Sequence, residues 1–192
     1  AHVTALEVAE AVGALGVISP PTITMKMQPE RPRPPDLSPV MSRTELERRL
    51  VIAGYQEIAR RCHALRAVII VEPLNRYEQD WPRTLRDAVE LCSAVDDPHC
   101  RMMADLFHMN IEESHVAAAL RETPPHLLMN VHLADSVRRL PGTGHTDFQA
   151  AFRVLKEMEY PHFCGLECGI DGDPETALAE TVRTLRRLWA AA

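Results

Sequence analysis

Residues 67–78 read AVIIVEPLNRYE, and this stretch decides how the rest of the sequence is interpreted. Residues 67–71 are apolar and mostly β-branched, which is typical of a strand that is buried on both faces. The apolar run stops at Glu72 and Pro73. The stretch therefore predicts a buried parallel strand with a glutamate at its carboxyl end.

Strands and helices are expected to alternate along the rest of the chain. Apolar runs predict four further strands, at residues 16–19, 101–106, 127–133 and 163–166. Apolar residues at helical spacing predict helices over residues 5–15 and 111–121 and further helices that open at or after Ser42, Pro82, Asp147 and Asp173. The proline-rich residues 28–39 predict a loop. This alternation indicates a parallel sheet covered by helices, either doubly wound or part of a (β/α)8 barrel.

Four residues of the kinds that bind metal ions occupy the carboxyl ends of four predicted strands: Glu72, Asp105, His132 and Glu167. They are separated by 33, 27 and 35 residues, about one strand-helix unit each. The carboxyl ends of barrel strands open onto one face, so these side chains are expected to meet there. Three carboxylates and one imidazole suit Mn2+, Mg2+ or Co2+. Each residue taken alone is equally consistent with an ordinary solvated loop position.

The composition narrows the range of partners. The chain has 27 acidic and 21 basic residues, a net charge of -6, which argues against a nucleic-acid partner. No run approaches the ~20 apolar residues of a membrane span, so no membrane partner is expected. Five cysteines without Cys-x-x-Cys spacing indicate reduced thiols and a cytoplasmic protein. No linker divides the chain, so residues 1–192 are expected to form a single domain.

Three longer blocks carry a resemblance to a known family. Residues 72–78 read EPLNRYE, residues 105–113 read DLFHMNIEE, and His132 is followed by RRLPGTG at 138–144. In order and spacing these blocks resemble those of the ketose 3-epimerases, the tagatose and psicose 3-epimerase family. These enzymes are metal-dependent sugar isomerases and epimerases of the xylose-isomerase-like TIM-barrel superfamily. Glu167 falls where that family has the glutamate of its last strand.

The resemblance implies roles for individual residues. It implies that Glu72, Asp105, His132 and Glu167 are the metal ligands, with Mn2+ as the expected ion and Mg2+ or Co2+ as alternatives. It implies further that Glu72 and Glu167 are the two catalytic acid/base groups. The residues that match positions in contact with substrate oxygens are Glu78, His108 and Arg138.

The implied reaction is consistent with these residue types. Epimerisation beside a carbonyl group removes a weakly acidic proton and leaves an enediolate, which a divalent ion stabilises. One carboxylate removes the proton from one face and a second returns a proton to the other. If the proton returns to a different carbon, the outcome is aldose–ketose isomerisation. Arg138 is expected to hold a distal hydroxyl or phosphate group of the sugar.

The chain is short for this fold. A full barrel has about 250 residues, and the five predicted strands match the family's fourth to eighth. A partial barrel leaves its first and last strands as open edges, so a homo-oligomer that covers them is expected. Cys168 and Gly169 also follow Glu167 where ketose epimerases more often have Pro-Phe. The identity of the sugar is therefore left open.

Other functions remain possible at the level of the sequence. Inosose dehydratases, which are lyases, share the fold and the ligand set. A DNA-repair endonuclease of the same superfold needs further His and Asp ligands and a basic groove, which are not evident here. A truncated barrel that binds metal or assembles without turnover is a non-enzymatic alternative.

Three further acidic residues are not assigned to the chemistry. Glu112 and Glu113 are expected in a first helical turn. Asp135 either supports His132 or is a solvated loop acid.

Overall fold

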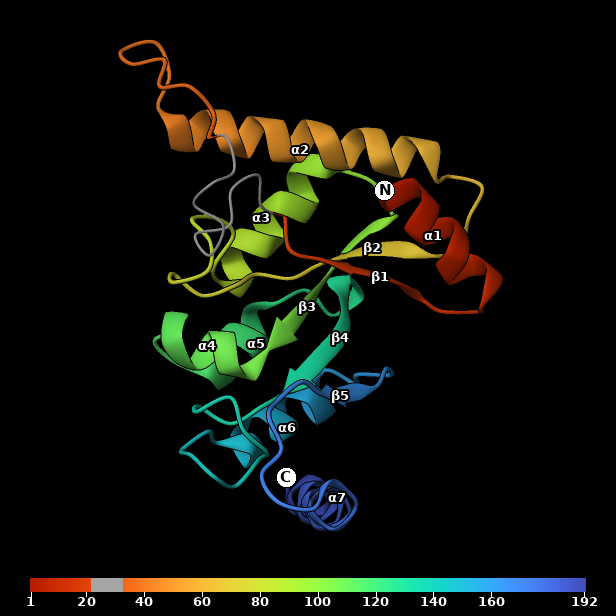
Figure 1. Ribbon diagram of the computed structural model, residues 1–192, viewed down its shortest axis with the longest axis vertical. Helices are drawn as coiled ribbons and strands as arrows, with labels where there is room; N and C mark the ends of the chain where they lie inside the picture. Colours follow the sequence, from red (N-terminus) through yellow and green to blue (C-terminus); the bar gives the residue numbers. More distant parts are fainter. Residues whose placement is uncertain (22–32) are drawn as a thin grey trace.

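The computed structural model describes residues 1–21 and 33–192. Five parallel strands form one sheet in the order of the chain (Figure 1). They are β1 (Gly16–Ser19), β2 (Val68–Val71), β3 (Cys100–Asp105), β4 (Leu128–Leu133) and β5 (Cys164–Leu166). All five expected strands are present, with ends no more than one residue from those expected. Residues 28–32 of the expected loop lie outside the described residues, and 33–39 run as a loop.

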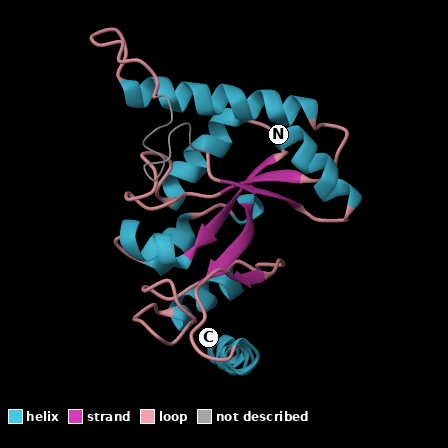
Figure 2. Ribbon diagram, in the orientation of Figure 1, coloured by secondary structure: helices cyan, strands magenta, loops and turns pink. Residues whose placement is uncertain are grey.

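Helices connect successive strands and surround the sheet, which lies at the centre of the molecule (Figure 2). They are α1 (His2–Ala11), α2 (Arg43–Arg61), α3 (Leu85–Val95), α4 (Leu106–Glu112), α5 (Val116–Glu122), α6 (Phe148–Glu157) and α7 (Pro174–Ala191), with a short 3-10 turn at Pro125–Leu127. The alternation expected from the sequence is therefore confirmed. No helix within residues 1–21 and 33–192 is both long and apolar enough to cross a bilayer.

The helix expected over residues 111–121 is wrong in its bounds. Two short helices replace it, because Asp105 caps a helix that begins at once after β3, and His115 caps a second. The Asp105 side chain accepts hydrogen bonds from the backbone N–H groups of Phe107 and His108. Glu112 and Glu113 consequently lie at the end of α4, not in a first helical turn.

The helix expected to open at Pro82 begins slightly later. Thr84 is its N-cap residue, and Thr84 and Asp87 exchange hydrogen bonds in a capping box. Asp147 and Asp173 cap the last two helices, since Asp147 accepts the N–H of Ala150 and Asp173 accepts that of Thr176. Local capping chemistry thus fixes where these helices start.

The core contains the central strands and the inner faces of the helices. In β2, Ile69, Ile70 and Val71 are all buried, which confirms the strand buried on both faces. Apolar residues of the strands pack against helix residues such as Leu91 of α3 and Leu120 of α5. This core supports the carboxyl ends of β2, β3 and β4 on well-packed elements.

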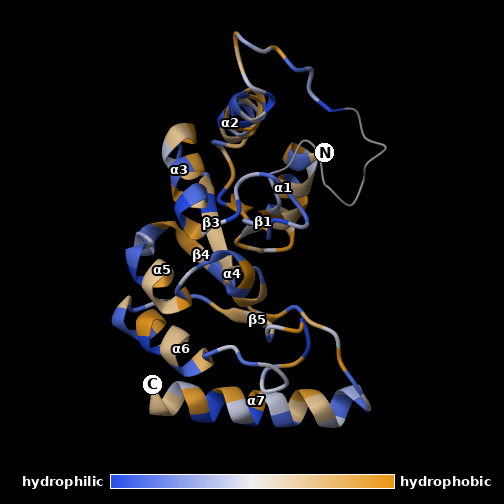
Figure 3. Cartoon of the chain, turned by 90° about the vertical axis from the view of Figure 1, so that its left-hand side faces the viewer, coloured by the Kyte–Doolittle hydropathy of each residue, from blue (hydrophilic) through white to orange (hydrophobic). Residues whose placement is uncertain are grey.

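The two edges of the sheet are more exposed. Helices α2 and α7 lie at opposite ends of the molecule's long axis (Figure 1), and α7 carries polar and apolar residues along its whole length (Figure 3). Beside β5, the side chain of Phe163 is 82% exposed. An apolar groove of about 500 Å³ lies between β5 and α7, and its lining includes Phe152, Phe163 and Trp189.

Candidate metal centre

The register of the sheet aligns the four predicted ligands at one edge. Asp105 pairs with His132 across β3 and β4, and His132 pairs with Gly165 of β5. Glu72 and Glu167 come directly after β2 and β5. The strands are parallel, so all four residues lie at their carboxyl ends. One ligand atom from each of the four lies within 4.8 Å of those from the others.

The His132 imidazole is the centre of this group. Its Nδ1 atom faces three carboxylate oxygens, at 3.2 Å from Glu167 Oε2, 3.5 Å from Asp105 Oδ2 and 3.6 Å from Glu72 Oε1. Burial alone would lower the pKa of His132, but Asp105, Glu72 and Glu167 outweigh it and raise that pKa to about 10. The site therefore attracts a positive charge strongly.

Two buried oxygen atoms show that a divalent cation fits here. Glu72 Oε1 and Asp105 Oδ2 are buried and have no hydrogen-bond partner among residues 1–21 and 33–192. An unpaired buried carboxylate oxygen is costly, and native proteins rarely leave one unsatisfied. A cation bound among Glu72, Asp105, His132 and Glu167 would satisfy both oxygens, and three oxygen donors with one nitrogen donor suit Mn2+ or Mg2+.

The carboxylates of the group differ in their environment. Burial raises the pKa of Asp105, but the nearby His132 and His108 outweigh it and hold the pKa below its usual value. Glu167 is 46% exposed, and burial followed by the charge of Glu72 raises its pKa. A carboxyl group with a raised pKa takes up a proton more readily than an ordinary glutamate, which suits an acid/base group.

The structure brings Glu78 and Arg138 to the rim of this group. Arg138 Nη1 lies 3.1 Å from Glu78 Oε1, and Arg138 Nη2 lies 3.7 Å from Glu167 Oε2. The guanidinium also sits over the ring of Phe107, at 4.9 Å from its centroid. Arg138 thus connects the loop after β4 with the loop after β2 and with Glu167.

His108 lies fully buried below Glu78. Its Nδ1 atom accepts the backbone N–H of Asn75 at 3.2 Å, so the ring carries its proton on Nε2 when it is neutral. That Nε2 atom is buried and has no hydrogen-bond partner in the part of the chain that the structure describes. His108 therefore holds one unused donor, which supports its expected contact with a substrate oxygen.

Two further residues organise the site: Asn75, which the sequence did not single out, and Asp135, for which support of His132 was one of two alternatives. The Asn75 amide donates to Glu78 Oε1 at 3.0 Å and also lies 2.9 Å from His108 Nδ1. The Asp135 carboxylate accepts backbone N–H groups of Ser136, Gly142 and Thr146. Asp135 is buried and shapes the loop that carries Arg138, so the alternative of a solvated loop acid is wrong.

Comparison with known protein families agrees with the fold described above. A family model described as the xylose isomerase-like TIM barrel matches residues 3–188. The chain is 38% identical, over 120 residues, to 3-dehydro-D-guloside 4-epimerase of Escherichia coli, covering 62% of this chain and 45% of that protein. It is 29% identical over 114 residues to D-psicose 3-epimerase of Enterocloster bolteae, covering 59% and 38% respectively.

Solved structures show the same fold. The crystal structure of 3-keto-D-glucoside 4-epimerase from E. coli superposes with a TM-score of 0.82 and 31% identity, over 95% of this chain and 67% of that one. The matched region spans less than half the length of the two curated relatives. The five strands form a partial barrel, as expected from the sequence.

Proposed function

The chain belongs to the xylose isomerase-like TIM barrel family, and on that basis we propose that it acts as a metal-dependent sugar epimerase. The reaction inverts a carbon next to a carbonyl group through an enediolate, with Glu72 and Glu167 as the two acid/base groups. The observation that carries the proposal is the pair of unpartnered buried oxygens, on Glu72 and Asp105, beside His132 and Glu167.

Glu72, Asp105, His132 and Glu167 would hold the ion, with Mn2+ as the first choice and Mg2+ or Co2+ as alternatives. When bound, the ion supplies positive charge that stabilises the enediolate. Glu72 follows β2 and Glu167 follows β5, so the two carboxylates approach from opposite ends of the ligand group. Inversion requires two acid/base groups on opposite sides, because the proton must leave from one side of the carbon and a proton must return to the other.

Glu78, His108 and Arg138 would bind the oxygens of the sugar. The unused Nε2 donor of buried His108 suits a carbonyl or alkoxide oxygen. Arg138 is less buried and lies next to Glu78, so it suits a hydroxyl or phosphate group farther from the reacting carbon. In this arrangement His108 contributes to the rate and Arg138 mainly to binding.

The position of the inverted carbon follows the position of the carbonyl group. The names of the curated relatives include both 3-epimerases and a 4-epimerase. Both reactions invert a carbon beside a ketone, either C3 of a 2-ketose or C4 of a 3-keto sugar. We therefore propose that the substrate is a keto sugar or its phosphate, with a ketose 3-epimerase reaction as the first assignment.

The direct test is hydrogen exchange in D2O. The chain, loaded with Mn2+, is incubated with a panel of ketoses, ketose phosphates and 3-keto glycosides and followed by proton NMR. We expect loss of the signal from the hydrogen next to the carbonyl group. Glu167→Gln should reduce the exchange rate about 10²–10⁴-fold, whereas the exposed Glu180→Gln on α7 should leave it unchanged.

A second candidate is a chain that binds metal but does not turn over. It is favoured by the length of the match, which covers only 45% of the guloside epimerase. In that case the metal-loaded chain exchanges no hydrogen on any sugar of the panel, while metal still binds and depends on His132.

We also propose that the chain works in the cytoplasm and as a homo-oligomer. All five cysteines are free thiols, and Cys62, Cys92 and Cys100 are buried, which suits a reducing compartment. The open edges of the sheet favour association with a second copy.

A further inference from the structure

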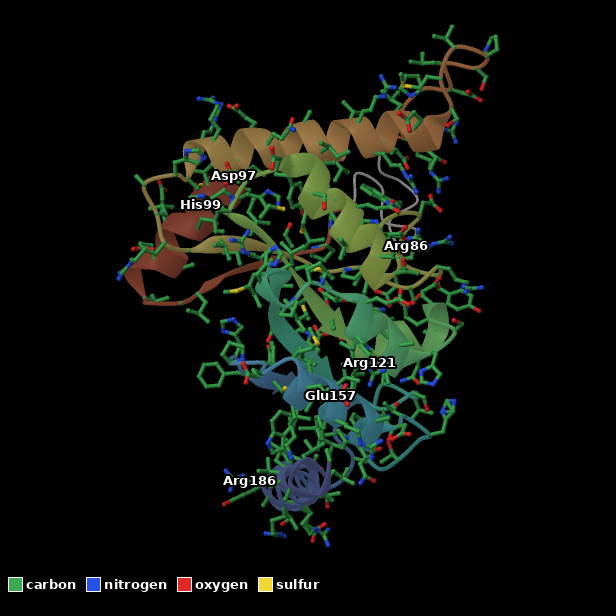
Figure 4. All side chains as sticks on the ribbon, turned by 180° about the vertical axis from the view of Figure 1, so that it is seen from behind. Arg86, Asp97, His99, Arg121, Glu157 and Arg186 are labelled. Atoms are coloured by element: carbon green, nitrogen blue, oxygen red, sulfur yellow. The ribbon has the colours of Figure 1, made fainter. Side chains whose placement is uncertain are left out.

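A second group of metal-binding side chains lies at the other end of β3. It consists of His63, just past the end of α2, with Asp97 and His99, just before β3. Figure 4 shows Asp97 and His99 beside the carboxyl-terminal end of α2. His99 and Asp105 are separated by the length of β3, roughly 20 Å at about 3.3 Å per residue. This group is therefore independent of the centre described above.

Asp97 and His99 are held in place before any ion binds. Asp97 Oδ1 accepts the backbone N–H of His99 at 2.8 Å, and His99 Nε2 lies 3.0 Å from the carbonyl oxygen of Leu65. Histidine ligands of metal ions typically donate their other N–H to such a carbonyl group. Burial raises the pKa of Asp97, but hydrogen bonds from His99 and His63 outweigh it and lower that pKa.

The His99 ring presents an acceptor nitrogen to the Asp97 carboxylate. A carbonyl oxygen only accepts, so Nε2 must carry the proton, and a neutral ring then has a lone pair on Nδ1. That lone pair faces Asp97 Oδ1, itself an acceptor, at 3.0 Å. A metal ion bound to both atoms would satisfy the two lone pairs together.

His63 adds a third ligand atom beside His99 and Asp97. Its Nε2 atom lies 2.6 Å from Asp97 Oδ2, and its ring stacks on that of His99 with centroids 5.2 Å apart. One dication would be ligated by both rings and by the carboxylate together. Zn–N bonds are about 2.0–2.1 Å long, so ligand atoms within 4.8 Å need only a small movement. His63 is 59% exposed and free to make it.

We propose that His63, Asp97 and His99 form a second metal site, which binds a transition-metal dication of the zinc type. Two imidazoles and one carboxylate favour zinc over manganese or magnesium, in contrast to the three carboxylates of the first centre. The bound ion ties the end of α2 to the loop between α3 and β3, and it leaves coordination positions open to water.

Calorimetric titration with Zn2+ alone tests this site in a His132→Ala background that disables the first centre. We expect one Zn2+ per chain and a rise in Tm of about 5–10 °C at a hundred-fold excess over Kd. Adding His63→Ala should weaken binding at least ten-fold, as should adding Asp97→Asn, whereas His162→Ala should not change it. His63 is exposed, so its replacement leaves the fold intact.

Three results would overturn the proposal. The first is a folded His132→Ala protein that binds no Zn2+. The second is Zn2+ binding that persists after His63→Ala and Asp97→Asn. The third is an equal response to Mn2+, which would show no preference for nitrogen ligands. None of these results bears on hydrogen exchange at the first centre, so the two proposals fail separately.

Discussion

The carboxylate of Asp135 is a buried anchor for the loop that carries Arg138. Backbone N–H groups of Ser136, Gly142 and Thr146 donate to it. Burial raises the pKa of Asp135, but these backbone hydrogen bonds, together with one from Gly144, outweigh it and hold that pKa well below its usual value. A depressed pKa means that the ionised carboxylate stabilises the folded state.

We predict that Asp135→Asn lowers the free energy of unfolding by about 2–3 kcal/mol at pH 7, because hydrogen bonds to a charged group are lost. The pKa is lower in the folded than in the unfolded chain. The stabilisation is therefore complete above the unfolded value of about 4 and is lost as the pH falls below it. Urea unfolding of both proteins between pH 7 and pH 3 measures this. A difference that stays constant with pH would contradict the assignment.

At the level of single residues, the sequence predicts which side chains meet, but not how they are supported. Glu72, Asp105, His132 and Glu167 were predictable because strand ends in a parallel sheet share one edge. The support from Asn75 and Asp135 was not, because it depends on hydrogen bonds to backbone atoms of loops. The spacing of apolar residues along the sequence does not reveal such loop geometry.

We predict that His108→Phe affects catalysis more than binding. The change removes the unused buried Nε2 donor and keeps a ring in the same space. If that donor stabilises developing charge on a substrate oxygen, kcat falls about 10²–10³-fold with little change in KM. Steady-state kinetics on the substrate identified by exchange gives both values. An effect confined to KM would show that His108 contributes to substrate binding and not to the catalytic step.

At the level of elements, hydrogen bonds connect helix α4 to the loop between β2 and α3. Glu112 accepts the Arg76 backbone N–H at 2.6 Å and the Arg76 guanidinium at 2.8 Å. Glu113 accepts the N–H of Leu85, the first residue of α3. The sequence placed both glutamates in a first helical turn, because apolar periodicity does not reveal that the Asp105 cap starts the helix earlier.

We predict that Glu112→Gln destabilises the fold by about 2 kcal/mol, since its nearly buried carboxylate makes charge-assisted hydrogen bonds to Arg76. The exposed Glu122→Gln in α5 serves as a control and should change stability by less than about 0.5 kcal/mol. Chemical denaturation of the two variants gives the comparison. Equal effects would show that the contact between α4 and the loop contributes nothing specific.

At the level of the whole molecule, one bound ion would join the ends of four strands. We predict that removing metal with EDTA lowers Tm by about 5–10 °C relative to protein in Mn2+ at a hundred-fold excess over Kd. His132→Ala should abolish this response to Mn2+. Differential scanning calorimetry measures both, and an unchanged Tm in the parent protein would argue against a metal ion at this position.

The exposed edge at β5 gives a prediction about assembly. Phe163 and the groove between β5 and α7 leave apolar surface uncovered in a chain of 21.5 kDa. We expect light scattering to give a mass of two or more chains. Phe163→Lys should shift the equilibrium toward the single chain, because charged residues at a strand edge oppose pairing. A monodisperse single chain at every concentration would contradict this.

Each strand of this sheet pairs only with its neighbours along the chain, from β1 to β5. No strand has to be inserted between two that are already paired. The sheet can therefore grow in one direction while the polypeptide leaves the ribosome. Each new strand, with its connecting helix, adds to the strand before it. The last ligand, Glu167, joins only when β5 is synthesised, so a nascent chain holds the other three ligands before its set is complete.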